Sequence, residues 1–97
     1  MEKIQKKVEK FCKENDMISP PEHQALDVMS ELGEVSKEIL KMSNYGRKKV
    51  KLNDNIKDEL GDVFYSLITL ANSFDINLKD ALNQSLKKYE KRIKLSK

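Results

Sequence analysis

Two pairs of acidic residues stand out in the sequence because each pair has helical spacing. Glu31 and Glu34 are three residues apart, and Glu59 and Asp62 repeat that spacing further along the chain. At about 100° per residue, the members of each pair fall within about 60° of one another and border the apolar positions of their helix. Like charges at this spacing repel. If the two helices pack together, the four carboxylates therefore need a counter-charge.

A hard divalent cation can supply that charge. Mg²⁺ binds protein carboxylates together with waters and substrate phosphates, and helical bundles are rigid hosts for carboxylate metal sites. A di-iron centre of the ferritin type needs Glu-x-x-His pairs, and the one histidine, His23, follows none of these acids at that spacing. We therefore predict a Mg²⁺ site, with Mn²⁺ as a substitute, whose ligands are Glu31, Glu34, Glu59 and Asp62.

The same acids would also suit two solvated helix faces with no ligand. A glycine lies inside each pair, Gly33 in the first and Gly61 in the second. Glycine costs a helix about 1 kcal/mol relative to alanine, and a close approach of backbone or ligand would account for that cost. The glycines and the matching angles of the two pairs favour the metal site over the solvated faces.

Four helical segments are expected to position these residues. We predict helices over about 1–15, from a start at Ser19–His23 to about 43, from a cap at Asp54 to about 73, and over 78–95. Apolar residues recur every three or four positions in the last two segments, which predicts an all-α, antiparallel bundle of four main helices. The stripe expected to form the core of the third helix is Ile56, Leu60, Val63, Phe64, Leu67, Ala71 and Phe74.

Length and composition set broad limits. The 97 residues suit a single domain (1–97), and a chain this short gains stability from forming an oligomer. The single cysteine, Cys12, the missing signal-peptide core and the lack of a long apolar run lead us to expect a cytoplasmic protein that binds no membrane. The net charge of +3 is mild and comes without a recognition motif, so we expect no nucleic-acid partner.

The last helix carries two cations beside its apolar stripe. Lys88 and Arg92 are one turn apart, and near a carboxylate–metal cluster they could hold phosphate oxygens. They could equally form ion pairs with Glu31 or Glu38. Both readings stay open at this point.

The two acidic motifs and their surroundings resemble the MazG-like all-α nucleoside triphosphate pyrophosphohydrolases. Glu31-x-x-Glu34, a gap of 24 residues and Glu59-x-x-Asp62 resemble the signature of that family. The flanking stretches "ALDVMSELGEVSKEILK" and "DELGDVFYSLITLANSFDINLKDAL" are similar to its two motif helices. The resemblance covers about residues 22–92.

The resemblance implies a Mg²⁺-dependent enzyme, a homodimer or homotetramer, that cleaves nucleoside triphosphates to the monophosphate and pyrophosphate as nucleotide house-cleaning. It implies that the four motif acids bind the metal and that Glu34 or Glu31 orients the attacking water. Some relatives have a lysine and an asparagine in the last helix where this chain has other residues, and some stack a tryptophan on the base. Here Lys88 and Arg92 are the candidates for phosphate and Tyr65, or Tyr45, for the base.

Two other functions remain as alternatives. One is a non-catalytic helical module that binds a metal, a nucleotide or a partner protein and serves in regulation. The other is a basic helical protein that binds nucleic acid, whose binding would depend strongly on salt. The sequence leaves open the preferred base and sugar.

Overall fold

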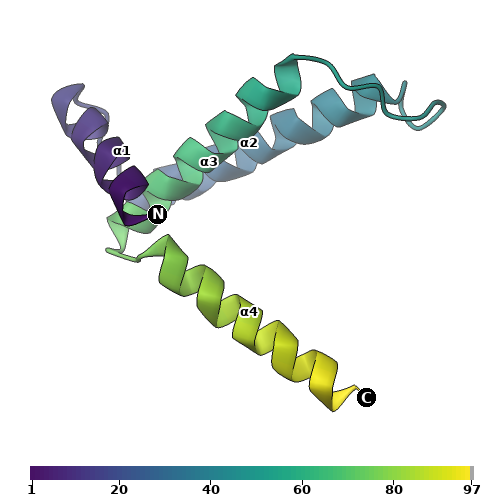
Figure 1. Ribbon diagram of the computed structural model, residues 1–97. Helices are drawn as coiled ribbons and strands as arrows, with labels where there is room; N and C mark the ends of the chain where they lie inside the picture. Colours follow the sequence, from purple (N-terminus) through teal and green to yellow (C-terminus); the bar gives the residue numbers. More distant parts are fainter. Residues whose placement is uncertain (97) are drawn as a thin grey trace.

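The computed structural model describes residues 1–96, which form four α-helices and no strand (Figure 1). The helices are α1 (Glu2–Glu14), α2 (Pro21–Met42), α3 (Asn55–Ser73) and α4 (Leu78–Leu95). The all-α fold is confirmed, and each helix begins and ends close to its predicted limits. None of the described helices combines the length with the apolar content that a membrane span needs.

Helices α2 and α3 form the antiparallel hairpin that carries both acidic pairs (Figure 1). Their closest packing is apolar, with Val35, Ile68 and Ala71 all buried. Helix α1 lies across the C-terminal half of α3, and its Cys12 is buried there. The hairpin is therefore the rigid frame of the molecule, and α1 covers one end of it.

A buried glutamine on α1 holds the joint between α3 and α4. The Nε2 group of Gln5 donates hydrogen bonds to Asn72 Oδ1 at 3.1 Å and to the carbonyl oxygen of Ile76 at 2.8 Å. Its Oε1 accepts from the backbone N–H of Leu78, and Asn72 Nδ2 donates to the Gln5 carbonyl oxygen at 3.1 Å. Helix α4 then starts with Asn77 as its cap, whose Oδ1 accepts from the N–H of Asp80.

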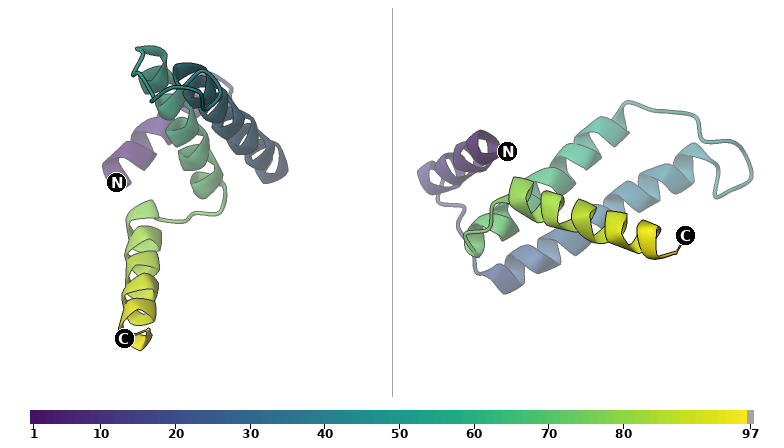
Figure 2. Two further views of the ribbon diagram at one scale, coloured as in Figure 1. Left: turned by 90° about the vertical axis from the view of Figure 1, so that its right-hand side faces the viewer. Right: turned by 60° about the horizontal axis from the view of Figure 1, so that its bottom comes forward.

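Beyond this joint, α4 extends away from the hairpin, as Figure 1 and the left view of Figure 2 show. It has no packed interface with another helix among the described residues. Its apolar stripe is consequently exposed, with Leu82, Leu86 and Ile93 each more than half accessible. A single chain thus presents an open arrangement in which the fourth side of the bundle is not covered by its own last helix.

The predicted core of α3 is only partly correct. Ala71 is buried, but Leu60, Phe64, Leu67 and Phe74 are exposed because α4 does not pack over them. The most deeply buried side chain is Ile68, which the predicted stripe does not include. The apolar positions that the sequence assigns to a core therefore divide into a small buried set and a larger uncovered face.

The two predicted helix starts lie close to the observed ones, but neither helix has a side-chain cap. Helix α2 starts one residue later than a Ser19 cap would require, because Pro20, in extended conformation, is its N-cap. Asp54 is the N-cap of α3, yet its backbone lies in the helical region and its side chain makes no capping bond. A capping side chain needs an extended backbone to reach back to the helix. Instead, Asn53 Oδ1 accepts from the N–H of Asn55 at 3.1 Å.

Candidate functional site

Three of the four predicted ligands meet where the middle of α2 faces the N-terminal half of α3. Glu31, Glu59 and Asp62 each offer one carboxylate oxygen, and these oxygens lie within 4.8 Å of one another. Glu31 and Glu59 are half-buried, and Asp62 is exposed. Two facing helices thus bring together acids that are about 30 residues apart in the sequence, at the edge of the hairpin.

The charge at this point is concentrated around Glu59. Its pKa is raised above the ordinary glutamate value, first by desolvation and then by Glu34, Asp62, Glu31 and Glu38. A raised carboxyl pKa means that the folded chain disfavours the ionised form. A hard divalent cation such as Mg²⁺ prefers oxygen ligands, and it can neutralise the negative charge of these acids. The residues therefore fit such a cation, and Glu34 lies within their electrostatic reach.

Glu38 is an acid that the predicted ligand set leaves out. Its side chain is only 12% exposed, and its Oε1 lies 3.8 Å from Nζ of Lys41 in an ion pair along α2. It also contributes to the raised pKa of Glu59 across the hairpin. The spacing of Glu34 and Glu38, one helical turn apart, is the sequence signal that places it on the same face.

The glycines of the two motifs face open space. A Cβ added to Gly33 or Gly61 would have no heavy atom within 4 Å outside its own helix. No close backbone contact within this chain therefore requires a glycine at either position. The space beside the carboxylates remains free for a ligand or a second subunit, and the role of the glycines stays a prediction.

The two predicted phosphate-binding cations lie away from the carboxylates. Lys88 and Arg92 are on α4, where Nζ of Lys88 is 5.1 Å and Cζ of Arg92 is 5.6 Å from the centre of the Tyr89 ring. Among the described residues, neither forms an ion pair with an acid. The alternative of a pair with Glu31 or Glu38 of the same chain is thus not observed. A phosphate-binding role stays a prediction.

Tyr65, the predicted contact for the base, packs beneath α1. Its hydroxyl lies 3.2 Å from the Cys12 thiol, and its ring meets Phe11 edge to face with centroids 6.3 Å apart. The hydrogen bond with Cys12, together with desolvation, raises the pKa of Tyr65 to about 12. The nearby charge of Asp27 adds to this shift, so Tyr65 borders the polar face of α2 as well. Tyr45, by contrast, is exposed in the connection after α2.

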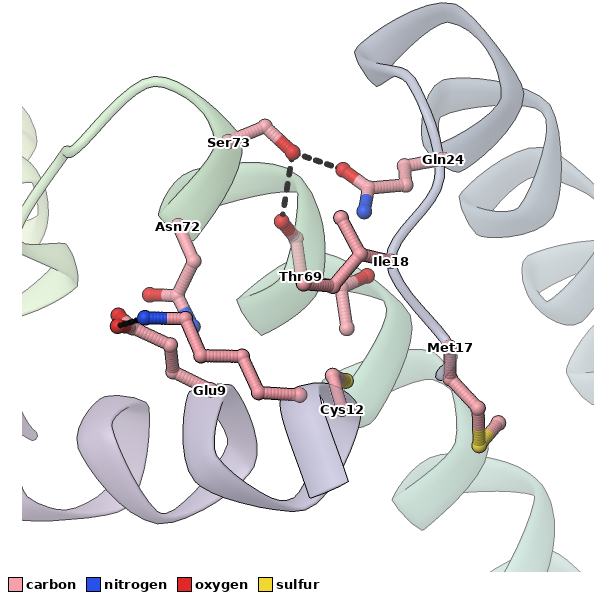
Figure 3. A pocket seen from close by; sticks show the side chains of 9 residues that line it. Glu9, Cys12, Met17, Ile18, Gln24, Thr69, Asn72 and Ser73 are labelled. Atoms are coloured by element: carbon pink, nitrogen blue, oxygen red, sulfur yellow. Dashed lines mark hydrogen bonds and ion pairs between the residues drawn. The ribbon is translucent and has the colours of Figure 1, made fainter. Parts of the chain in front are cut away.

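A cavity of about 280 Å³ opens between α1, the segment that leads into α2, and the C-terminal end of α3 (Figure 3). Met17 and Ile18 provide its apolar wall. Gln24 and Ser73 are joined by a hydrogen bond from the serine hydroxyl to the Gln24 Oε1. The remaining lining residues are Glu9, Cys12, Lys13, Thr69 and Asn72. No sequence pattern indicates this cavity, because its walls come from three separate segments.

Comparison with known proteins gives a family for most of the chain. Residues 20–95 match the sequence model of the MazG nucleotide pyrophosphohydrolase domain. A relative from Bacillus subtilis (strain 168), the uncharacterized protein YpjD, is 39% identical over 67 residues. That match covers 66% of this chain and 59% of the relative, so the chain spans less than two thirds of the relative's length.

Two solved structures are similar in fold. A Bacillus-conserved MazG protein, described as a nucleotide pyrophosphohydrolase, has a TM-score of 0.76 at 28% identity, covering 91% of this chain and 86% of that one. The putative pyrophosphatase YpjD from Bacillus subtilis has a TM-score of 0.73 at 31% identity, covering 89% and 88% respectively. The similarity therefore extends over nearly all of the helical arrangement described above.

Proposed function

The chain belongs to the MazG nucleotide pyrophosphohydrolase family, and from that premise we propose that it hydrolyses nucleoside triphosphates to the monophosphate and pyrophosphate. The observation that carries the proposal is the convergence of Glu31, Glu59 and Asp62 from facing helices, with their oxygens within 4.8 Å. Clustered carboxylates of this kind suit the binding of a cation that accompanies a polyphosphate.

In the proposed mechanism, the residues that would hold Mg²⁺, or Mn²⁺ in its place, are Glu31, Glu34, Glu59 and Asp62. When bound, the metal neutralises phosphate charge and lowers the pKa of water. Glu34, which is exposed, orients a water molecule toward the α-phosphorus and accepts the proton that this water loses as it attacks. The new bond forms between that water oxygen and the α-phosphorus. The bond from the α-phosphorus to its bridging oxygen breaks, and pyrophosphate leaves with the electron pair.

A second copy of the chain is part of the proposal. The uncovered apolar faces of α3 and α4 suit burial against another subunit, since contiguous exposed apolar surface usually marks an interface. Lys88 and Arg92 border the stripe of α4, whereas the carboxylates border those of α2 and α3. Packing these stripes together between subunits would bring the cations of one chain toward the acids of the other. We therefore propose a homodimer or homotetramer in which these cations contact substrate phosphates.

The test is a product assay with Mg²⁺ over a panel of ribo- and deoxyribonucleoside triphosphates. Release of the monophosphate and pyrophosphate, lost in Glu59→Ala, would support the proposal. Asp58→Ala is the matched control. Asp58 is an exposed acid immediately before Glu59 on α3, and it forms no ion pair among the described residues. Release of diphosphate and phosphate would contradict the proposed bond cleavage. Nucleotide binding without turnover would favour the regulatory module instead.

A further inference from the structure

The polar residues of α3 continue from the carboxylates to the cavity along one face. Asp62, Ser66, Thr69 and Ser73 follow one another at intervals of three or four residues, so they lie within about 60° on the helix. Thr69 is seven residues from Asp62, which corresponds to about 10 Å along the axis. The cavity is therefore within reach of a ligand whose other end lies at the carboxylates.

Helix α2 presents a matching polar face. Gln24, Asp27 and Glu31 are also spaced by three and four residues. At one end of the hairpin Gln24 bonds to Ser73, and toward the middle Glu31 meets Glu59 and Asp62. Between these points, Asp27 acts on the pKa of Tyr65. Polar residues of both helices therefore lie between the carboxylate cluster and the cavity, and Ser66 of α3 is buried among them.

The cavity offers an unused hydrogen-bond donor. Gln24 is only 6% exposed, and its Oε1 accepts a hydrogen bond from the Ser73 hydroxyl. Among the described residues, the Nε2 group of Gln24 makes no hydrogen bond. Every fully buried side-chain nitrogen or oxygen atom there has a hydrogen-bond partner. That nitrogen therefore retains access to solvent. Figure 3 shows it turned toward Ile18, on the cavity side.

The same cavity is also lined by an acceptor. The hydroxyl of Thr69 donates to the carbonyl oxygen of Ser66 at 2.8 Å, which leaves its lone pairs able to accept. The amide of Asn72 makes one hydrogen bond to Gln5 through each of its polar atoms and forms part of the wall. Glu9 and Lys13 neutralise each other in an ion pair at 2.7 Å. The cavity thus offers a neutral donor from Gln24 and a neutral acceptor from Thr69, together with apolar Met17 and Ile18.

We propose that this cavity receives the nucleobase of the substrate, an inference that rests on the proposed function. Gln24 Nε2 donates to a ring nitrogen or carbonyl oxygen, and the Thr69 hydroxyl accepts from the neighbouring N–H of the base. The volume of about 280 Å³ lies just below the roughly 300–1,000 Å³ of sites that enclose a complete ligand. It therefore suits one planar ring system, with the phosphates outside on the carboxylates and Tyr65 between.

The first experiment compares kcat/KM for four nucleoside triphosphates in three variants. Gln24→Met removes the amide at similar length, Thr69→Val removes the hydroxyl, and Thr69→Ser restores it. We expect the first two to lower kcat/KM for the preferred nucleotide about tenfold or more, mainly through KM, and to reduce the preference among bases. Thr69→Ser should recover most of both. An equal loss for all four nucleotides, or an unchanged preference, would overturn the assignment.

A second experiment does not depend on turnover. Unphosphorylated cytidine, uridine, adenosine and guanosine are titrated into isotope-labelled protein in EDTA and followed by NMR. The side-chain amide of Gln24 and the backbone amides of residues 69–73 should shift with at least one nucleoside, and these shifts should be lost in Gln24→Met. If no nucleotide yields pyrophosphate, the proposed function fails while this titration still judges the cavity. Shifts confined to other residues, or none at all, would overturn the cavity proposal alone.

Discussion

Gln5 and Leu78 join the first helix to the start of the last, because Gln5 Oε1 accepts a hydrogen bond from the Leu78 backbone N–H at 2.8 Å. The amide of Gln5 also bonds to Asn72 and to the carbonyl of Ile76, so one buried side chain contacts α3, the connection and α4. Helix α4 has no other packed interface among the described residues. Its direction therefore depends on this joint.

Replacing Gln5 by leucine should weaken the fold measurably. Gln5→Leu keeps the size of the side chain but leaves the Leu78 N–H and the Ile76 carbonyl without partners, and such losses cost about 1–3 kcal/mol. Urea unfolding should report that loss, and hydrogen exchange at the Leu78 amide should accelerate. Lys3→Leu, at an exposed α1 position, is the control. An equal loss in both variants would show that the hydrogen bonds are not responsible.

Neutralising Glu59 should stabilise the metal-free protein. Because the pKa of Glu59 is raised in the folded state, the folded chain keeps a proton on Glu59 at pH values where the unfolded chain has lost it. The metal-free protein therefore loses stability as pH rises from the ordinary glutamate pKa to the raised one. Above that window, Glu59→Gln should melt at a higher temperature than wild type in EDTA.

The same variant should respond less to metal. Adding Mg²⁺ should raise the melting temperature of wild type, since a ligand that binds the folded state stabilises it. That rise should be lost or strongly reduced in Glu59→Gln and kept in Asp58→Asn. An identical rise in all three proteins would argue against a metal site at these carboxylates.

The helices could be predicted from the sequence because their signals are local. Apolar residues at intervals of three and four set the limits of α3 and α4, and the same periodicity places Glu31 and Glu59 beside the apolar stripes. The joint could not be predicted, since Gln5 lies 67 to 73 residues from its partners. Nor could periodicity show that Leu60 and Phe64 are exposed in one chain, because a stripe looks alike whether its own chain or another covers it.

Tyr65 should titrate well above an ordinary tyrosine. Its pKa of about 12 means that the unfolded chain ionises first, near pH 10, so the stability that Tyr65 contributes is present below pH 10 and is lost between about 10 and 12. Ultraviolet difference absorption should show this late phenol in wild type and lose it in Tyr65→Phe. Cys12→Ala should move it to lower pH. Tyr45→Phe, at an exposed site, is the control and should leave the late transition in place.

A charge in the apolar stripe of α4 should separate the proposed subunits. Leu86→Glu places a carboxylate where we propose that a partner packs, and light scattering after gel filtration should show a lower mass than for wild type. Lys87→Glu introduces the same charged side chain at the neighbouring exposed position, on the far side of the helix, and should keep the wild-type mass. A monomeric wild type at all concentrations would contradict the proposed oligomer.

The long sequence separation at the joint bears on the order of folding. Hairpin α2–α3 is built from contacts between neighbouring helices, whereas the joint closes a loop of more than 70 residues for a few hydrogen bonds. Closing a longer loop costs more chain entropy, and folds rich in local contacts form faster. We therefore expect the hairpin to fold first and Gln5 to dock last. During synthesis, the side-chain amide of Gln5 would lack its hydrogen-bond partners until Leu78 has left the ribosome.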